Sequence, residues 1–177
     1  MNTLHAGHLV LEPQVAGHAA AMFLVLSDPA IYAFENVPPE SQGWLEQRFA
    51  KLESRHSADG TEQWLNWVIR LPSGALAGYV QATVTKKCVA HIAYELASKF
   101  WRQRVGSAAV GAVLAELGAS YCVSTFVATL KVRNSRSAAF LRHLGFTTTP
   151  PIDLAPIGRE SDEVVMYKAH VSNGNAA

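Results

Sequence analysis

The chain has 177 residues, of which 49% are hydrophobic, and this length and content suit one globular domain with a sizeable core. Its formal net charge of +1 argues against a nucleic-acid or membrane partner held by bulk electrostatics, since such partners usually meet a concentrated basic face. We expect a single domain over residues 1–171 and a disordered tail over residues 172–177.

The cysteines indicate the cellular compartment, and the spacing of the histidines indicates no metal site. Cys88 and Cys122 lie within apolar stretches, which is typical of reduced core thiols. The N-terminal region lacks a signal-peptide pattern, and no apolar stretch approaches the ~20 residues that span a bilayer. We therefore expect a cytoplasmic protein. His5, His8 and His18 have no ligand-like spacing with carboxylates or cysteines, so no metal site is expected.

The first half of the chain predicts two helices between strands. Residues 9–11 form a short apolar run, which suits a first strand that ends before Pro13. Residues 14–26 and 39–55 carry apolar residues at helical spacing, and Ser41 could cap the second helix. Three consecutive strands, joined by short turns, are then expected over residues 64–71, 76–85 and 88–97.

The second half alternates helices and strands. The expected elements are a small-residue helix over 105–117 that Gly118 ends, a strand over 124–132, a helix over 135–144 that Gly145 closes, and a last strand over 163–170. The order β-α-α-β-β-β-α-β-α-β predicts an α/β fold with a mixed, largely antiparallel sheet and helices on both faces. Neighbouring strands in such a sheet splay apart at one point, where ligands bind.

The segment from Ile92 to Gly111 has the features of an anion site. A strand ends there, a basic loop follows, and a small-residue helix begins at Val105. The first turn of a helix has free N–H groups and partial positive charge, and Gly106 would let a phosphate approach the backbone. Arg102 and Arg104 could add charge-assisted hydrogen bonds. The alternative is a solvated basic loop before a core helix.

The same segment, IAYELASKFWRQRVGSAAVG, resembles the pyrophosphate loop Q/R-x-x-G-x-G/A of the GCN5-related N-acetyltransferases. One register places Trp101 at the leading Gln/Arg, Arg104 at the first Gly and Gly106 at the second Gly/Ala. A shifted register begins at Gln103 and ends at Ala108. We favour the first register because its spacing from the preceding strand fits the family, although it puts an arginine where the family has glycine.

A second segment strengthens the resemblance. Residues 130–146, LKVRNSRSAAFLRHLGF, resemble the family's strand and helix with the pattern N-x-x-S/A…L-G-F. Asn134 and Ser137 match the first half of this pattern. The likeness covers roughly residues 64–146, and it is greatest to the branch that includes the ribosomal-protein alanine acetyltransferases.

The resemblance implies a fold, a co-substrate and a reaction. The fold is that of the acyl-CoA N-acyltransferases, and the reaction moves the acetyl group of acetyl-CoA to a primary amine by direct attack on the thioester. The amine would belong to a protein N-terminus or to a small molecule. The residues expected to hold acetyl-CoA are Leu96, Ala97, Arg102, Gln103, Arg104, Val105, Gly106, Ser107, Ala108, Asn134 and Ser137.

Two residues are candidates for the general base. Alternation along the strand 88–97 puts His91 and Glu95 on one face, and the family often carries a Glu or His base early in this strand. Many members carry a Tyr acid for the departing thiolate at the position of Leu141. Because leucine cannot donate a proton, either the thiolate leaves without a protein acid, which its low basicity permits, or another group donates. Ser137, with Ser135 a weaker choice, could do so directly or through water.

The sequence says less about the residues that bind the amine acceptor. The resemblance implies that Phe34-Glu35-Asn36 lies over the acceptor site, and we expect Phe34, Glu35 and Trp44 to be substrate contacts. Two other functions stay open: a non-catalytic CoA or acyl-CoA binding module on the same fold, and an enzyme that acetylates antibiotics or polyamines. Apolar residues of the last strand could support a homodimer.

Overall fold

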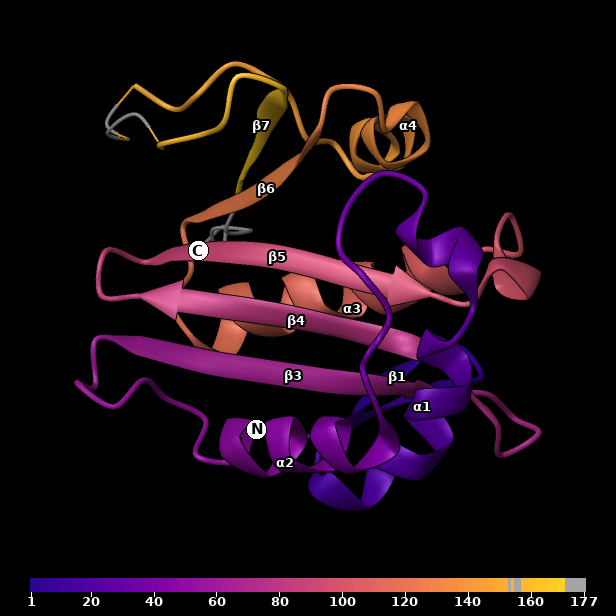
Figure 1. The fold of residues 1–177 in the computed structure, drawn as a ribbon. Helices are drawn as coiled ribbons and strands as arrows, with labels where there is room; N and C mark the ends of the chain where they lie inside the picture. The colour runs from indigo at the N-terminus through magenta and orange to yellow at the C-terminus, as the bar shows by residue number, and fades with distance from the viewer. Residues whose placement is uncertain (153, 155–156, 171–177) are drawn as a thin grey trace.

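The computed structural model describes residues 1–152, 154 and 157–170, and within these residues seven strands form one sheet in the order of the chain (Figure 1). The expected tail over 172–177 lies outside the described residues. The strands are β1 (Leu4–Ala6), β2 (Leu9–Pro13), β3 (Glu62–Arg70), β4 (Leu76–Thr85), β5 (Val89–Leu96), β6 (Thr125–Lys131) and β7 (Glu163–Ala169). β5 and β6 pair in parallel, and each other neighbouring pair is antiparallel.

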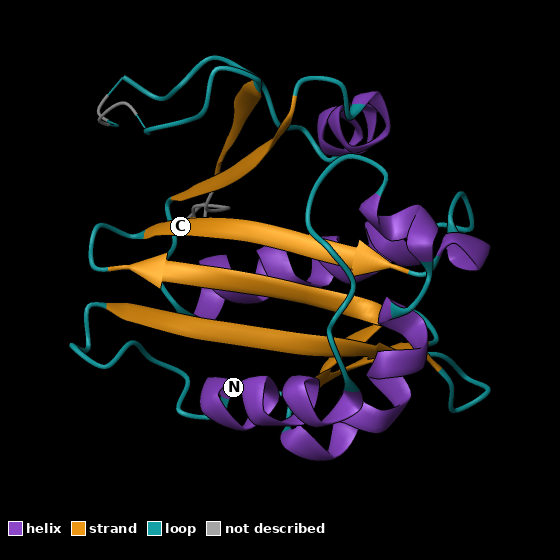
Figure 2. Cartoon of the chain, in the orientation of Figure 1, coloured by secondary structure: helices purple, strands orange, loops and turns teal. Residues whose placement is uncertain are grey.

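Helices cover both faces of the sheet (Figure 2). They are α1 (Ala19–Leu26), α2 (Gln42–Leu52), α3 (Val105–Ser120) and α4 (Ser135–His143), with 3-10 turns η1 (Ala16–His18), η2 (Pro29–Tyr32) and η3 (Ser98–Phe100). α1 and α2 pack on the face that carries Val68, while α3 packs on the face that carries Trp67. The predicted mixed, largely antiparallel sheet with helices on both faces is therefore confirmed.

Local sequence explains where the helices begin and end. Ser41 caps α2 as predicted, because its hydroxyl accepts a hydrogen bond from Trp44 N–H at 3.1 Å. Gly145 closes α4 at φ +85°, a left-handed conformation that glycine adopts without cost. The prediction that Gly118 ends the third helix is wrong, since α3 continues to Ser120. Gly118 is small for another reason: a Cβ there would collide with the ring of His170.

The sheet has one more strand than predicted. Residues 4–6 pair with β2 in a hairpin whose turn contains Gly7 at φ +63°. Three residues are too few for an alternating pattern to be read from the sequence, and only the partner strand reveals this one. β1 lies at the edge of the sheet, at the opposite end from β6 and β7, and none of its residues lines the cleft described below.

The neighbouring strands β5 and β6 separate, as the predicted topology requires. Their parallel pairing ends at His91 and Val127. Beyond that point β6 stays paired with β7 through Lys131, while β5 stays paired with β4 through Leu96. The edge of β5 over residues 92–96 therefore faces an opening instead of a strand, and its main-chain groups on that side are free to bind a ligand.

Candidate active site

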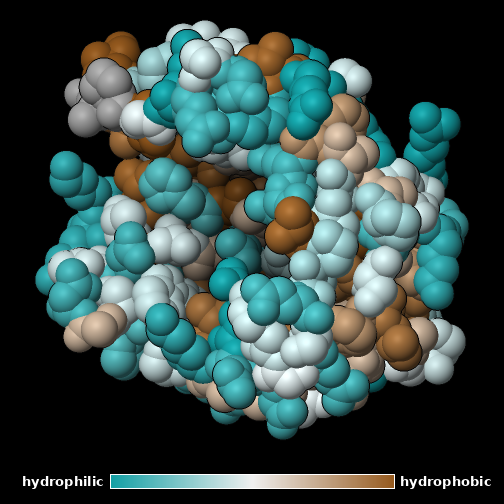
Figure 3. Space-filling view, viewed as in Figure 1, coloured by the Kyte–Doolittle hydropathy of each residue, from teal (hydrophilic) through white to brown (hydrophobic). Residues whose placement is uncertain are grey.

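A cleft of about 1570 Å³ lies where β5 and β6 separate. It runs from the start of α3 and α4 to the space between the sheet and α2. Figure 3 shows the surface hollowed at this place, with both hydrophobic and hydrophilic side chains in the hollow. Pockets for single small ligands usually measure about 300–1000 Å³, so this cleft has room for a large ligand and a second, smaller one.

The outer end of the cleft is the basic loop before α3. Arg104 is the N-cap of this helix and has φ +62°, and Arg102 has φ +60°. The first main-chain hydrogen bond of α3 runs from Ala108 N–H to the Arg104 carbonyl at 3.0 Å, which leaves the N–H groups of the first turn for a ligand. These groups and two guanidinium groups make this end suitable for phosphates.

The backbone of this loop favours one of the two registers. The left-handed region that Arg104 occupies is the one glycine prefers, which fits a position where the family has its first Gly. The shifted register would put that Gly at Gly106, which lies inside α3. A Cβ on Gly106 would meet the ring of Phe140 at 3.5 Å and Leu96 at 3.9 Å, so a side chain larger than methyl would enter the space between α3 and α4.

A third arginine, Arg136 of α4, packs on two aromatic rings at this end of the cleft. The Arg136 guanidinium lies 3.6 Å from the centre of the Trp101 ring, and 5.7 Å from that of Phe34. Burial lowers the pKa of Arg136, although the group stays charged at neutral pH. Arg133 Nη2 donates to the Phe34 carbonyl at 2.7 Å. These contacts hold the segment between η2 and α2 across the cleft.

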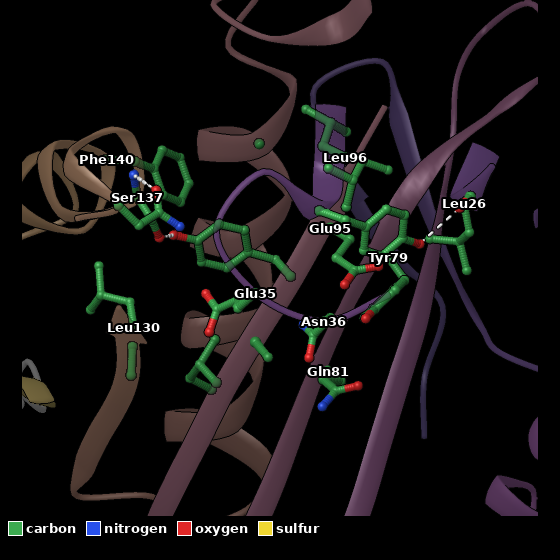
Figure 4. Close-up of a pocket in the computed structure, with 18 of the residues that line it drawn as sticks. Leu26, Glu35, Asn36, Tyr79, Gln81, Glu95, Leu96, Leu130, Ser137 and Phe140 are labelled. Carbon is green, nitrogen blue, oxygen red and sulfur yellow. Dashed lines mark hydrogen bonds between the residues drawn. The ribbon is translucent and has the colours of Figure 1, made fainter. Parts of the chain in front are cut away.

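A tyrosine on β5 meets the start of α4. The hydroxyls of Tyr94 and Ser137 lie 2.7 Å apart, and Asn134 accepts a hydrogen bond from Ser137 N–H at 3.0 Å (Figure 4). The rings of Tyr94 and Phe140 pack edge to face with centroids 4.9 Å apart. Burial raises the pKa of Tyr94 to about 12, so its hydroxyl keeps its proton and can donate a hydrogen bond at neutral pH.

Glu95 is the carboxylate on the sheet side of the cleft. It lies opposite Tyr79 of β4, and Figure 4 shows the two side chains together, with Asn36 nearby. Burial raises the pKa of Glu95, while hydrogen bonds from Tyr79 and Asn36 and the charge of Arg48 partly oppose this. A carboxylate with a raised pKa binds a proton more readily, which suits a general base.

Glu35 supplies a second carboxylate from the segment that crosses the cleft. Burial raises the pKa of Glu35, and a hydrogen bond from Asn134 partly lowers it. In Figure 4 the side chain lies between Ser137 and Asn36. The cleft therefore has arginines at its outer end and, further in, two carboxylates with Arg48 of α2 near Glu95.

The structure brings most of the predicted site residues together. Those that line the cleft are Glu35, Trp44, Glu95, Leu96, Arg102, Arg104, Gly106, Ser107, Asn134 and Ser137. Those that do not line it are Phe34, His91, Ala97, Gln103, Val105 and Ala108. His91 is on the same face of the sheet as Glu95. It pairs with Thr83, whereas Glu95 pairs with Tyr79, so the two side chains are separated by one further pair on that face, Gln81 and Ala93. Burial lowers the pKa of His91, so its ring is neutral at pH 7.

Sequence reasoning missed several polar residues that line the cleft. They include Gln14, Arg48, Asn66, Tyr79, Gln81, Tyr94 and Arg136. Asn66 stands within a strand whose neighbours Leu65 and Trp67 are buried, and a polar residue in that position is a signal that could have been used. Leu141 is only 1% exposed and belongs to the core, so the side chain at this position supplies no proton.

The features of the cleft fit acetyl-CoA. Its phosphates would meet the arginines and the first turn of α3, and the amide groups of its pantetheine arm would meet the free edge of β5. Among the described residues no group of three or more His, Cys, Asp or Glu side chains is placed to hold a metal ion. No helix in the described part of the chain is long and apolar enough to cross a membrane.

Comparison with protein families decides the class of the protein. Residues 8–147 match the model described as "Acetyltransferase (GNAT) domain". The chain belongs to this family. It is an N-acetyltransferase that uses acetyl-CoA as its co-substrate, and the predicted family, enzyme class and cofactor are confirmed. No curated protein matches the sequence.

Solved structures share the fold at low sequence identity. The ribosomal-protein-S5-alanine acetyltransferase of Vibrio fischeri is 17% identical, with a TM-score of 0.78 over 96% of this chain and 97% of the other. A ribosomal L7/L12 alpha-N-protein acetyltransferase in complex with coenzyme A is 18% identical, with a TM-score of 0.79 over 95% of this chain and 98% of the other. A chimera of the spermidine N-acetyltransferase from Vibrio cholerae is 17% identical, with a TM-score of 0.72 over 92% and 96%.

Proposed function

We propose that this acetyltransferase binds acetyl-CoA between β5 and β6 and acetylates a primary amine held beside Glu95. One observation carries the proposal: the cleft has cations at the end where a phosphate loop begins a helix, and carboxylates at the end where an amine would bind. A protein N-terminus and a small-molecule amine are both acceptors of this kind. Similar folds acetylate ribosomal proteins and spermidine, according to the proteins compared above.

The phosphates of acetyl-CoA would lie on residues 102–108. Arg102, Arg104 and the free N–H groups of the first turn of α3 provide positive charge and donors there. Arg136 adds a third guanidinium through its place on Trp101. The acyl arm would then extend along the free edge of β5 towards Glu95, with Ser137 and Asn134 on its other side.

Glu95 is the proposed base. An amine with a pKa near ~10 arrives mostly protonated at neutral pH and cannot attack until it loses a proton. Glu95 would take the first proton from the ammonium group, directly or through water, and release it to solvent. The neutral nitrogen then forms its bond to the thioester carbonyl carbon, and the C–S bond breaks as the nitrogen loses its second proton to Glu95. That second proton passes to the thiolate, so the products are a neutral amide, coenzyme A and one proton in solvent. His91 lies outside the cleft and is the weaker candidate.

The pair of Tyr94 and Ser137 would stabilise the departing thiolate. The two hydroxyls share one hydrogen bond, so one hydroxyl hydrogen of the pair is available to the sulfur. Because the pKa of Tyr94 is about 12, well above that of a thiol near ~8.5, the pair donates a hydrogen bond rather than a proton at rest. Ser137, which the sequence predicted as a proton donor, would thus act with Tyr94 as a hydrogen-bond donor to the thiolate.

Two experiments test the proposal in sequence. Calorimetric titration with acetyl-CoA should give 1:1 binding at micromolar affinity, and release of coenzyme A thiol should then depend on an added amine. A panel of amines, followed by mass spectrometry of the products, identifies acetylated acceptors. Binding without amine-dependent thiol release from any acceptor would contradict the proposed reaction.

The location and assembly of the protein are also proposals. Cys88 and Cys122 are both free thiols, which supports a reducing compartment such as the cytoplasm. β7 has β6 on one side, and on its other edge Tyr167 exchanges two main-chain hydrogen bonds with Thr147, so a homodimer would form on the rest of that edge. Fractionation of cells and sedimentation of the purified protein test these two points.

A further inference from the structure

Three carboxamide side chains form a row across the sheet in the acceptor half of the cleft. Asn66 of β3 lies directly opposite Gln81 of β4, so both side chains are on the same face. Gln14, which follows β2, continues the row. Its main-chain N–H donates to the main-chain carbonyl of Asn66 at 2.8 Å, so the two residues lie side by side. All three line the cleft, and we call them the carboxamide row.

The row is buried and incompletely paired. Gln14 is 2% exposed and Asn66 is 4% exposed, although both are polar. The side-chain nitrogen of Gln14 is buried and has no hydrogen-bond partner among the described residues. A buried donor without a partner destabilises a protein, and native structures keep few of them. The unpaired donor therefore points to a ligand that binds here.

The row lies within reach of the proposed base. Gln81 is one strand away from Glu95 and two residues along the sheet, since Glu95 pairs with Tyr79. With strand and residue spacings of a regular sheet, the Cα atoms of Gln81 and Asn66 are roughly 8 and 12 Å from that of Glu95. An acceptor whose amine meets Glu95 can therefore place its remaining atoms over the row.

The chemistry of the row selects a kind of acceptor. Carboxamides are uncharged and both donate and accept hydrogen bonds, so they match amides and hydroxyls. A second ammonium group would need a carboxylate, and among the described residues that line the cleft only Glu35 and Glu95 carry one. Both lie at the amine end rather than along the row.

Building on the proposed function, we propose that the carboxamide row binds the body of the acceptor, and that the acceptor is an amine with neutral amide or hydroxyl groups roughly 5–10 Å from its nitrogen. Such groups occur in a peptide N-terminus and in small hydroxylated amines. A polyamine, with charged nitrogens at this distance, fits the row poorly because each ammonium would lose its hydration without meeting a counter-charge.

The test compares four amines by calorimetric titration into the coenzyme A complex. Alanyl-alaninamide represents a peptide N-terminus, glucosamine a hydroxylated small amine, hexylamine an apolar amine and spermidine a polyamine. We expect at least one of the first two to bind about tenfold more tightly than both of the others. Preference for alanyl-alaninamide identifies a peptide-like acceptor, and preference for glucosamine a hydroxylated one. Because binding is measured without turnover, this result is independent of whether the amine is then acetylated.

Variants test whether the row causes the preference. Gln81→Leu and Asn66→Leu remove hydrogen-bonding groups and should each weaken binding of the preferred amine about fivefold, leaving hexylamine unchanged or tighter. Gln81 is half-buried, so its replacement is the safer of the two for folding. Thr83→Val is the matched control, since Thr83 lies two residues further along the same face and outside the cleft. Equal binding of all four amines, or a preference that survives both leucine variants, would overturn the proposal.

Discussion

The two halves of the cleft are built in different ways. The cofactor half comes from segments that are short and continuous in sequence: residues 92–108 and residues 134–141 supply nearly all of it. The acceptor half combines β2, β3, β4 and β5 with α2 and the segment before it, so its polar residues are spread over some 80 positions.

The difference follows from what each half must bind. Phosphates and pantetheine amides can be held largely by main-chain groups, and main-chain geometry leaves marks in a local sequence, such as a loop followed by a small-residue helix. An acceptor is recognised by side chains that meet only when the sheet has formed. We therefore expect changes in the cofactor half to affect coenzyme A affinity, and changes in the acceptor half to affect the amine.

The largest expected effect is on turnover, in the acceptor half. Glu95→Gln should lower kcat about a hundredfold or more, because it removes the proposed base and keeps the shape of the side chain. His91→Asn, on the same strand face but outside the cleft, should change kcat less than threefold. Steady-state thiol release measures both, and calorimetry should show unchanged acetyl-CoA affinity. A large loss in His91→Asn alone would assign the base to the histidine.

The next effect is on coenzyme A affinity, in the cofactor half. Gly106→Leu should weaken binding by about 2 kcal/mol, roughly thirtyfold, because the new side chain meets Phe140 and Leu96 where the arm should pass. Gly111→Leu is the control on the same helix, since a Cβ there has no atom within 4 Å. Titration with coenzyme A distinguishes the two. Equal affinities would remove the loop from the cofactor site.

A smaller effect on kcat is expected at Tyr94, which lies between the cofactor half and the acceptor half of the cleft. Tyr94→Phe should lower kcat about tenfold, because the thiolate loses a hydrogen bond to a charged atom. Tyr121→Phe removes a half-buried hydroxyl outside the cleft and should leave kcat unchanged. Both variants should bind acetyl-CoA like the parent protein. An unaffected kcat in Tyr94→Phe would mean that sulfur departs without help from this pair.

The smallest effect is on stability at the phosphate loop. Arg104 has φ +62°, a conformation that glycine adopts freely and alanine does not. Arg104→Gly should therefore be more stable than Arg104→Ala by about 1 kcal/mol in chemical denaturation. Equal stability of the two variants would show that the loop relaxes out of this conformation in solution.

The cofactor half of the cleft could be predicted from the sequence better than the acceptor half. The order of helices and strands, the separation of two strands and the place of Gly106 could be predicted, because periodicity and loop chemistry are local. The place of Asn134 and Ser137 in the cleft was predicted only from the resemblance of residues 130–146 to the family. β1 was missed because three residues carry no period. The carboxamide row was missed because Gln14, Asn66 and Gln81 are brought together by strand pairing alone.

The pH dependence of kcat tests the role of Glu95 most directly. A base acts only after it loses its own proton, so kcat at saturating substrates should rise as pH passes the pKa of Glu95, which burial places above its usual value. We predict that His91→Asn keeps this rising limb, whereas Glu95→Gln is slow and lacks it. A limb that remains in Glu95→Gln and disappears in His91→Asn would contradict the proposed mechanism.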